Sequence, residues 1–148
     1  DDKVTAAPSD AESAPIEKYL RGRRVLLVDD EEAIRTGMGA LLQGWGCEVI
    51  TAGSVTDALA STRHATLDAV ISDMGLPGTG NGIDAIAILR ERHGTGLPAL
   101  LVTGDTSQNT LQAAAEAGLI MLHKPIKPAR LRAALTTAIA ASSARAAP

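Results

Sequence analysis

Short apolar runs alternate with longer stretches of helical periodicity along the chain from residue 23 onward. The first run, about Arg24 to Val28, has the length and composition of a buried strand. After it, apolar residues recur from Ile34 to Trp45 at i, i+4, i+7, i+8 and i+11, the spacing of one helical face. Gly44 and Gly46 are expected to end this helix.

Four further rounds of the same alternation follow. The predicted strands are Cys47 to Thr51, Leu67 to Ser72, Pro98 to Val102 and Leu119 to His123. The predicted helices begin after Ser54, cover about 83–90 and about 107–117, and run from Pro128 through Ile139. Five strand–helix rounds indicate an α/β fold, with a doubly wound, five-stranded parallel sheet.

The ends of the chain have a different composition. Residues 1–22 are rich in Ala, Ser, Asp and Glu, contain two prolines and lack an apolar period, which predicts a flexible linker or arm. The domain proper is expected over residues 23–141, and a disordered tail over 142–148. Because the sequence begins with Asp, we expect it to be a segment of a longer chain or a processed product.

Composition narrows the classes of function. The chain of 148 residues has one Trp, one Tyr and no Phe, which argues against base-stacking surfaces. Its net charge of -3 gives no electrostatic footprint for nucleic acid or an anionic membrane. The single Cys47 excludes an internal disulfide, and no apolar run is long enough for a membrane helix. We therefore expect a cytoplasmic domain with no nucleic-acid partner and no direct membrane contact.

Polar side chains stand at the carboxyl ends of the predicted strands. Asp29 and Asp30 follow the first strand, Asp73 the third, Thr103 the fourth and Lys124 the fifth. Parallel strands bring these ends to one edge of the sheet, where open α/β folds bind their ligands. Residues far apart in the sequence should therefore meet in one shallow site.

The types of these residues suggest their chemistry. Crowded carboxylates resist ionisation unless positive charge lies among them. Mg²⁺ prefers oxygen ligands and is commonly held by carboxylates together with phosphate oxygens. A carboxylate kept ionised in this way, here Asp73, can act as a nucleophile toward phosphorus. The Thr103 hydroxyl and the Lys124 ammonium would then contact the phosphoryl oxygens.

The segments VDDEE, SDMGLPG, VTGD and HKP together resemble the receiver domain of two-component response regulators, over about residues 23–141. This resemblance implies a (βα)5 flavodoxin-like fold with strand order 2-1-3-4-5. It implies a histidine kinase or a histidine phosphotransfer domain as the partner, with pairing of two copies through the fourth and fifth helices as a further expectation. The arrangement of arm and domain resembles the C-terminal receiver of a hybrid sensor histidine kinase.

The resemblance also assigns roles to individual residues. It implies that Asp73 accepts the phosphoryl group, that Asp30 binds Mg²⁺ directly and that Asp29 supports the ion through water. The backbone carbonyl of Gly75 is expected to complete the metal site. Thr103 and Lys124 would take the phosphoryl contacts described above, with Pro125 following Lys124 through a cis peptide bond.

Several positions depart from the family's pattern. Met121 stands where an aromatic residue that rotates on phosphorylation is usual, and Ile126 also replaces an aromatic. The loop after Pro77, GTGNG, is one residue longer than usual and should be mobile or turn through positive φ. Asp105 is expected to tune the loss of the phosphoryl group.

Three alternative functions remain open. The first is a free single-domain response regulator, and the second is a pseudo-receiver that acts only through protein binding. The third is a phosphatase of the haloacid-dehalogenase type, which uses an Asp after its first strand and a second Asp two positions later. Glu31 occupies that second position here, which disfavours the phosphatase.

Overall fold

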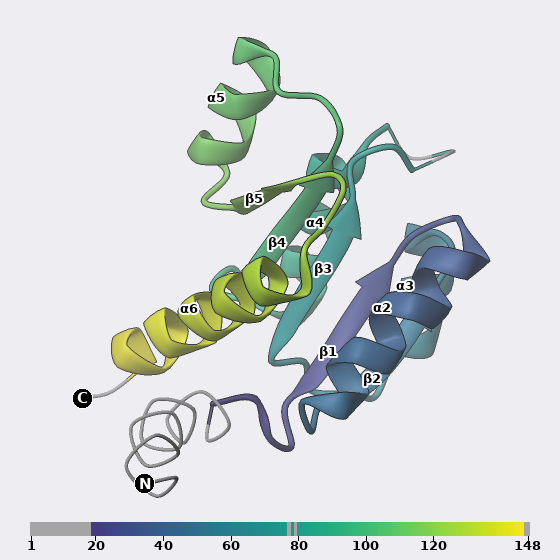
Figure 1. The fold of residues 1–148 in the computed structure, drawn as a ribbon, viewed down its shortest axis with the longest axis vertical. Helices are drawn as coiled ribbons and strands as arrows, with labels where there is room; N and C mark the ends of the chain where they lie inside the picture. Colours follow the sequence, from purple (N-terminus) through teal and green to yellow (C-terminus); the bar gives the residue numbers. More distant parts are fainter. Residues whose placement is uncertain (1–18, 77, 79, 147–148) are drawn as a thin grey trace, which may run out of the picture.

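The computed structural model describes residues 19–76, 78 and 80–146 and contains one five-stranded parallel sheet (Figure 1). The strands are β1 (Arg24–Val28), β2 (Glu48–Ala52), β3 (Ala69–Asp73), β4 (Ala99–Thr103) and β5 (Ile120–His123). The helices are α2 (Glu32–Gly44), α3 (Val55–Ser61), α4 (Gly82–His93), α5 (Gln108–Glu116) and α6 (Pro128–Ala146). The strand order is β2-β1-β3-β4-β5, which confirms the predicted doubly wound fold.

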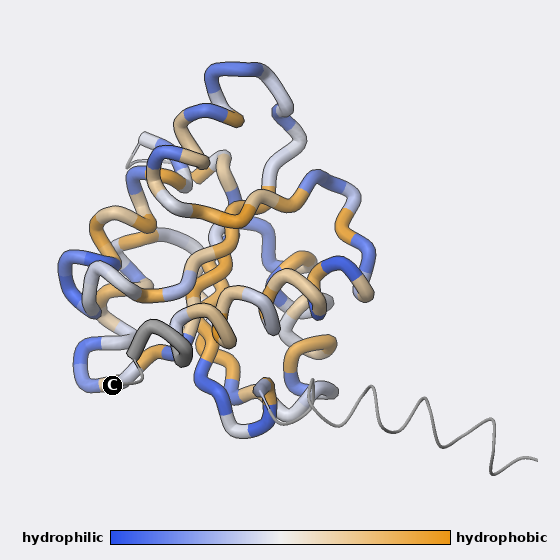
Figure 2. Tube along the Cα trace, turned by 90° about the vertical axis from the view of Figure 1, so that its left-hand side faces the viewer, coloured by the Kyte–Doolittle hydropathy of each residue, from blue (hydrophilic) through white to orange (hydrophobic). Residues whose placement is uncertain are grey.

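The helices cover both faces of the sheet because successive strand residues point to opposite sides. Val25 and Leu27 of β1 belong to one hydrophobic cluster, with residues of α2 and α6. Leu26 and Val28 belong to the other, with residues of α3, α4 and α5. The central strands are therefore buried on both sides, which explains their nearly continuous apolar sequences. Figure 2 shows this hydrophobic interior as an orange centre.

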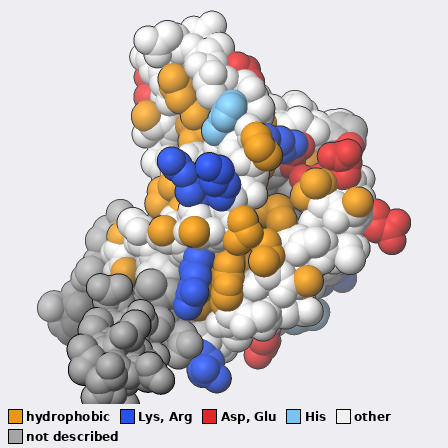
Figure 3. Space-filling model, viewed as in Figure 1, with side chains coloured by type: hydrophobic (Ala, Val, Ile, Leu, Met, Phe, Trp, Pro, Cys, Tyr) orange, Lys and Arg blue, Asp and Glu red, His pale blue; other side chains and the backbone are white. Residues whose placement is uncertain are grey.

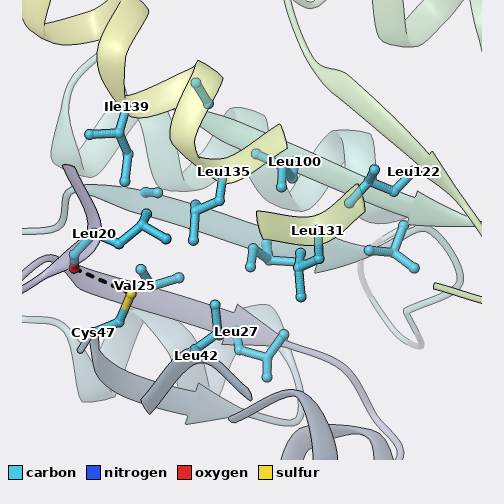
Figure 4. Packing of buried hydrophobic residues seen from close by; sticks show 14 residues of the cluster. Leu20, Val25, Leu27, Leu42, Cys47, Leu100, Leu122, Leu131, Leu135 and Ile139 are labelled. Carbon is cyan, nitrogen blue, oxygen red and sulfur yellow. Dashed lines mark hydrogen bonds between the residues drawn. The ribbon is translucent and has the colours of Figure 1, made fainter. Parts of the chain in front are cut away.

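Leu131, Leu135 and Ile139 carry the packing of α6 on the sheet (Figure 4). They recur at i, i+4 and i+8 on one side of the helix, and each is almost fully buried. Val25 and Leu100 lie in the same cluster. The core is thus built mainly from aliphatic side chains, in keeping with a chain that has one Trp, one Tyr and no Phe.

The segment just before β1 is part of the core, so the predicted flexible arm is wrong for residues 19–22. Leu20 is 1% exposed and packs in the cluster beneath α6. Its carbonyl accepts a hydrogen bond from the Cys47 thiol, and the Gly22 N–H donates to the Gly46 carbonyl at 2.8 Å. A single leucine among polar residues has no periodicity that could reveal this docking. Residues 1–18 lie outside the described part of the chain.

The last helix is longer than predicted. Helix α6 continues to Ala146, so residues 142–146 are helical and the expected disordered tail is wrong there. The sequence after Ala141 contains only Ser, Ala and Arg before Pro148, and Ala and Arg are strong helix formers. Residues 147–148 lie outside the described ranges. Among the described helices, none combines the length and apolar character needed to cross a membrane.

We predict that the thiol of Cys47 is unreactive in the native protein. Burial raises its pKa to about 11, so the nucleophilic thiolate is scarce at neutral pH. At pH 8, alkylation by iodoacetamide should be much slower in buffer than in concentrated urea, where the thiol is exposed. Mass spectrometry over a time course measures both rates. Equal rates in the two solutions would contradict the prediction.

Candidate functional site

The strand ends place the predicted site residues along one edge of the sheet. Asp73 is the last residue of β3, and Thr103 is the last residue of β4. Asp29 directly follows β1, where its N–H donates to the Ala52 carbonyl. Lys124 directly follows β5, where its N–H donates to the Thr103 carbonyl at 2.9 Å. These backbone hydrogen bonds extend the sheet by one residue. They fix the backbone positions of Asp29 and Lys124, and so the positions from which the two side chains extend.

Three carboxylates meet at this edge. Carboxylate oxygens of Asp29, Asp30 and Asp73 all lie within 4.8 Å of one another. Asp29 is 2% exposed and Asp73 is 6% exposed, whereas Asp30 faces solvent. The Lys124 Nζ lies 2.7 Å from Asp73 Oδ1. One ammonium therefore faces three carboxylates, and the site is short of positive charge.

Burial and hydrogen bonds set the charge states of this cluster. Burial raises the pKa of Asp29, although the hydrogen bond from the Glu31 N–H to Asp29 Oδ1 opposes the rise. The hydrogen bond to Asp73 raises the pKa of Lys124 and keeps its ammonium charged. A divalent cation would supply the missing charge, and the carboxylates are the hard oxygen ligands that such ions prefer. The residues present therefore fit a bound metal ion.

The loop after β3 passes close to this cluster. A Cβ built on Gly75 would lie 3.7 Å from Asp73 Oδ2, so the backbone at Gly75 is near the carboxylate. Gly78 and Gly80 have φ of 89° and 87°, which confirms the predicted turn through positive φ. Residues 77 and 79 of the same loop lie outside the described residues. The peptide bond between Lys124 and Pro125 is cis, as predicted.

The hydroxyl of Thr103 is bonded within its own loop. It accepts a hydrogen bond from the Asp105 N–H at 2.9 Å and donates to the Asp105 carbonyl at 3.4 Å. The Asp105 carboxylate in turn accepts from the Ser107 N–H and the Thr110 hydroxyl in the first turn of α5. These bonds lower the pKa of Asp105. Its expected role in phosphoryl loss stays a prediction.

Sequence reasoning missed two residues that shape the site. Gly82 begins α4, and its N–H donates to the Met74 carbonyl at 2.7 Å. A Cβ at Gly82 would overlap the Asp73 carbonyl oxygen, so only glycine allows this approach. Arg35 of α2 donates to the Asp29 carbonyl at 2.7 Å. A glycine directly after the helix cap Asn81 could have hinted at close packing, but no pattern marked Arg35.

An apolar groove opens beside Lys124, between α2 and the segment that joins β5 to α6. It has a volume of about 640 Å³, and its apolar lining comes mainly from Ile34, Met38, Leu41, Pro125 and Ile126. Figure 3 shows hydrophobic side chains gathered on this face, with Lys and Arg side chains on one side and Asp and Glu side chains on the other. A protein that covers the groove would also reach the edge that carries the carboxylates.

The fold and the site define a doubly wound α/β domain with an acidic cluster and a lysine at the carboxyl edge of its sheet. The family model of the response regulator receiver domain matches residues 25–136. The chain therefore belongs to the receiver domain family of two-component signalling proteins.

Curated relatives include complete regulators and kinases. The CAI-1 autoinducer sensor kinase/phosphatase CqsS of Vibrio cholerae is 33% identical over 107 residues, which cover 71% of this chain and 16% of CqsS. The DNA-binding response regulator MtrA of Mycobacterium tuberculosis is 34% identical over 118 residues, which cover 76% of this chain and 50% of MtrA. The chain thus spans half or less of the length of these two relatives.

Solved receiver structures share the fold. The chemotaxis protein CheY4 of Vibrio cholerae is 32% identical, with a TM-score of 0.73 and coverage of 79% of this chain and 98% of CheY4. The receiver domain of the sensor histidine kinase PA1611 of Pseudomonas aeruginosa is 28% identical, with a TM-score of 0.70 and coverage of 80% and 98%. The latter structure holds a magnesium ion in its active-site cleft.

Proposed function

We propose that this domain accepts a phosphoryl group on Asp73 from the phosphohistidine of a histidine kinase or a histidine phosphotransfer domain, and acts as a signalling switch in a phosphorelay. One observation carries the proposal. The Asp73 carboxylate, at the end of a buried strand, contacts Lys124 and shares a 4.8 Å neighbourhood with two further carboxylates. Such a constellation suits nucleophilic attack on phosphorus.

In the proposed reaction, a carboxylate oxygen of Asp73 attacks the phosphorus atom. The bond between phosphorus and the donor's imidazole nitrogen breaks, and its electron pair stays on that nitrogen. The product is an acyl phosphate on Asp73. The sheet holds the nucleophile rigidly, because Asp73 pairs with Val102 of β4 in the ladder and the next N–H, that of Met74, donates to the Val102 carbonyl.

Lys124 and Thr103 are proposed to hold the transferred group. The Lys124 ammonium already lies 2.7 Å from Asp73 and would form an ion pair with a phosphoryl oxygen there. The Thr103 hydroxyl would donate to another phosphoryl oxygen, for which it must leave the Asp105 carbonyl. Both groups stabilise negative charge on the oxygens during transfer and afterwards.

We infer that the metal ion is Mg²⁺, held by Asp30 and Asp73 directly, by Asp29 through water, and by the backbone carbonyl of Gly75. When bound, Mg²⁺ would neutralise the carboxylates and the incoming phosphoryl oxygens. The excess of carboxylates over ammonium groups in the cluster supports this proposal, as does the magnesium ion in the PA1611 receiver.

We predict that Asp73→Asn abolishes phosphorylation. With acetyl phosphate and Mg²⁺, the unaltered protein should gain one phosphoryl mass, whereas the variant should gain none because an amide is not a nucleophile. Intact mass spectrometry at neutral pH measures the adduct, and EDTA should prevent it. Asp57→Asn, a matched change on the exposed surface of α3, should leave labelling unchanged. Absence of labelling in the wild-type protein would refute the proposed function. Labelling of Asp73→Asn would show that a residue other than Asp73 accepts the phosphoryl group.

The protein context is proposed as a hybrid histidine kinase, with a free response regulator as the alternative. The matches to CqsS and to the PA1611 receiver support a kinase context, while CheY4 and MtrA support a free or DNA-binding regulator. For the domain itself we propose a protein partner in the cytoplasm rather than nucleic acid, because its net charge is negative. The sequence of the full-length gene product upstream of residue 1 distinguishes these contexts.

The apolar groove supports a protein as the phosphoryl donor. Lys124 lines the groove and also contacts Asp73, so a donor seated there has its histidine within reach of the acceptor. The pseudo-receiver alternative is disfavoured because Asp29, Asp30, Asp73, Thr103 and Lys124 are all present at one edge. Pairing of two copies through α5 and α6 stays a prediction.

A further inference from the structure

Positive and negative side chains are unevenly distributed along this chain. All 17 Asp and Glu residues lie before residue 117. Five Lys and Arg residues follow, with no acidic residue among them: Lys124, Lys127, Arg130, Arg132 and Arg145. The unit made of β5 and α6 is therefore positive, although the whole chain has a net charge of -3. Such asymmetry is typical of a surface that attracts an anionic partner.

The folded chain gathers part of this positive charge around one hollow. The hollow lies between the end of β5 and the first turn of α6 and has a volume of about 390 Å³. Among the described residues, its lining includes His123, Lys124, Lys127 and Arg130 and no carboxylate. The Lys127 carbonyl accepts from the Arg130 N–H at 3.0 Å, which brings these two residues together. We call His123, Lys127 and Arg130 the basic patch, and Figure 3 shows Lys and Arg side chains gathered near a His side chain on this face.

The two cations of the basic patch are exposed and form no ion pair within the part of the chain that the structure describes. The ion pairs found there are formed by other cations, those of Arg23, Arg24 and Lys124. Arg132 differs from Lys127 and Arg130, because its guanidinium lies over the Trp45 ring, 5.9 Å from the ring centre. That arginine has a packing role, whereas Lys127 and Arg130 keep their charge in solvent.

The position of Lys127 and Arg130 is unfavourable for the helix itself. Arg130 lies in the first turn of α6, Lys127 directly precedes the helix, and the first turn contains no acidic residue. The start of a helix carries partial positive charge, so cations there destabilise it and carboxylates would stabilise it. Cations that served only solubility could stand elsewhere on the surface without this cost. Their placement at the start of α6 therefore supports a role in recognition.

We propose that the basic patch is a docking surface for an acidic segment of a partner protein, whose Asp or Glu side chains pair with Lys127 and Arg130. The inference goes beyond the proposed phosphoacceptor function, because binding at the patch needs no chemistry at Asp73. Opposite charges across the contact would steer the partner and fix its orientation on the domain.

The surroundings of the patch favour a protein over nucleic acid as the occupant. The patch adjoins the apolar groove beside α2, since Lys124, Pro125 and Ile126 line both the groove and the hollow. An apolar surface suits protein side chains and offers nothing to phosphates. On the far side of the groove, Asp30 and Glu31 are exposed and would repel a duplex that extends beyond the patch. A protein segment with an acidic end and an apolar stretch matches the patch and the groove together.

A titration of the full chain with a model acidic peptide tests the inference. The probe is the peptide (Glu-Ala)5, and (Gln-Ala)5 is its neutral counterpart. Two-dimensional NMR of the isotope-labelled protein should show saturable amide shifts at the end of β5 and the start of α6 with the acidic peptide only. Raising the ionic strength from about 0.1 M to about 1 M shortens the screening length from about 10 Å to about 3 Å and should largely abolish the shifts.

Paired substitutions locate the binding surface. Lys127→Gln with Arg130→Gln should weaken peptide binding by about two- to thirtyfold, because each exposed ion pair contributes only a small factor. Arg63→Gln with Arg92→Gln is the matched control. It removes the same amount of charge from two exposed arginines that follow α3 and end α4. The control should bind the peptide as wild type does.

Charge reversal separates recognition from damage to the fold. Lys127→Glu with Arg130→Glu should abolish binding of (Glu-Ala)5 and at the same time raise the urea midpoint, because carboxylates favour the start of α6. Loss of binding through misfolding would instead lower that midpoint. A variant that loses binding and also loses stability would count against the patch as a recognition surface.

Each further outcome either supports or overturns the inference. Absence of amide shifts at the patch, or equal weakening in the Arg63 and Arg92 control, would overturn it. Tighter binding of a short DNA duplex at the patch would assign the surface to nucleic acid. Self-association that is lost in Lys127→Gln with Arg130→Gln would assign it to a second copy. Failure of acetyl phosphate to label Asp73 would refute the proposed function and leave this inference intact.

Discussion

Replacing Gly82 by alanine is expected to disrupt both the stability and the chemistry of this domain. The new Cβ would overlap the carbonyl oxygen of Asp73 and lie 2.8 Å from Leu101 Cδ1. Helix α4 must then move away from the end of β3, and overpacking of this kind costs about 1–3 kcal/mol or more. Because the overlap falls on the backbone of Asp73, the proposed phosphoacceptor, we also expect labelling of Asp73 by acetyl phosphate to slow markedly.

The matched control is Gly37→Ala, the same substitution within α2. A Cβ at Gly37 meets no atom within 4 Å, so its effect is limited to helix propensity. This variant should gain about 0.5–1 kcal/mol in the free energy of unfolding. Urea unfolding followed by circular dichroism compares the two variants. If Gly82→Ala unfolded at the same urea concentration as Gly37→Ala, the close approach of α4 to β3 would be wrong.

Replacing Leu20 by alanine is expected to have the second large effect. Leu20 is almost fully buried beneath α6, and truncation of such a leucine costs about 2–5 kcal/mol through lost burial and the cavity left behind. Since domains are stabilised by only about 5–15 kcal/mol, this is a large fraction of the total. The loss should appear as an earlier midpoint in urea unfolding and as a lower melting temperature.

Leu111→Ala provides the control for this prediction. The change removes the same atoms from a side chain that is 40% exposed on α5, where surface substitutions usually shift stability by less than about 0.5 kcal/mol. The difference between the two variants isolates the burial of Leu20. Similar small losses in both would show that Leu20 contributes little to the core.

Most of the fold was predictable because parallel sheets buried on both faces produce continuous apolar strands. The five predicted strands agree with β1 to β5 within two residues at each end. Each observed strand boundary depends on ladder bonding, such as the pairing of Asp73 with Val102, which apolar content does not indicate. The alternation of apolar runs and helical periodicity therefore predicted the positions of the strands more accurately than their end residues.

The composition of the site was also predictable. Asp29, Asp73, Thr103 and Lys124 stand at or just after the ends of parallel strands, so they must lie at the carboxyl edge of the sheet. The direction of the Thr103 hydroxyl was not predictable, because it depends on the loop that follows and on Asp105. The contacts of Gly82 and Arg35 could not be predicted for a similar reason. Both involve backbone carbonyls, of Asp73 and Asp29, whose positions only the folded structure defines.

The docking of Leu20 fixes the end of the sheet at which the described chain enters the domain. The Leu20 carbonyl accepts from Cys47 and the Gly22 N–H donates to Gly46, just before the amino end of β2. Strands of five residues place that end of the sheet about 16 Å from the carboxylates. Residues 19–22 therefore lie at the end of the sheet opposite the carboxylates and do not cover the proposed site. Expression fragments trimmed to the family boundary at residue 25 would lack this anchor, so a start at or before Tyr19 is the sounder choice.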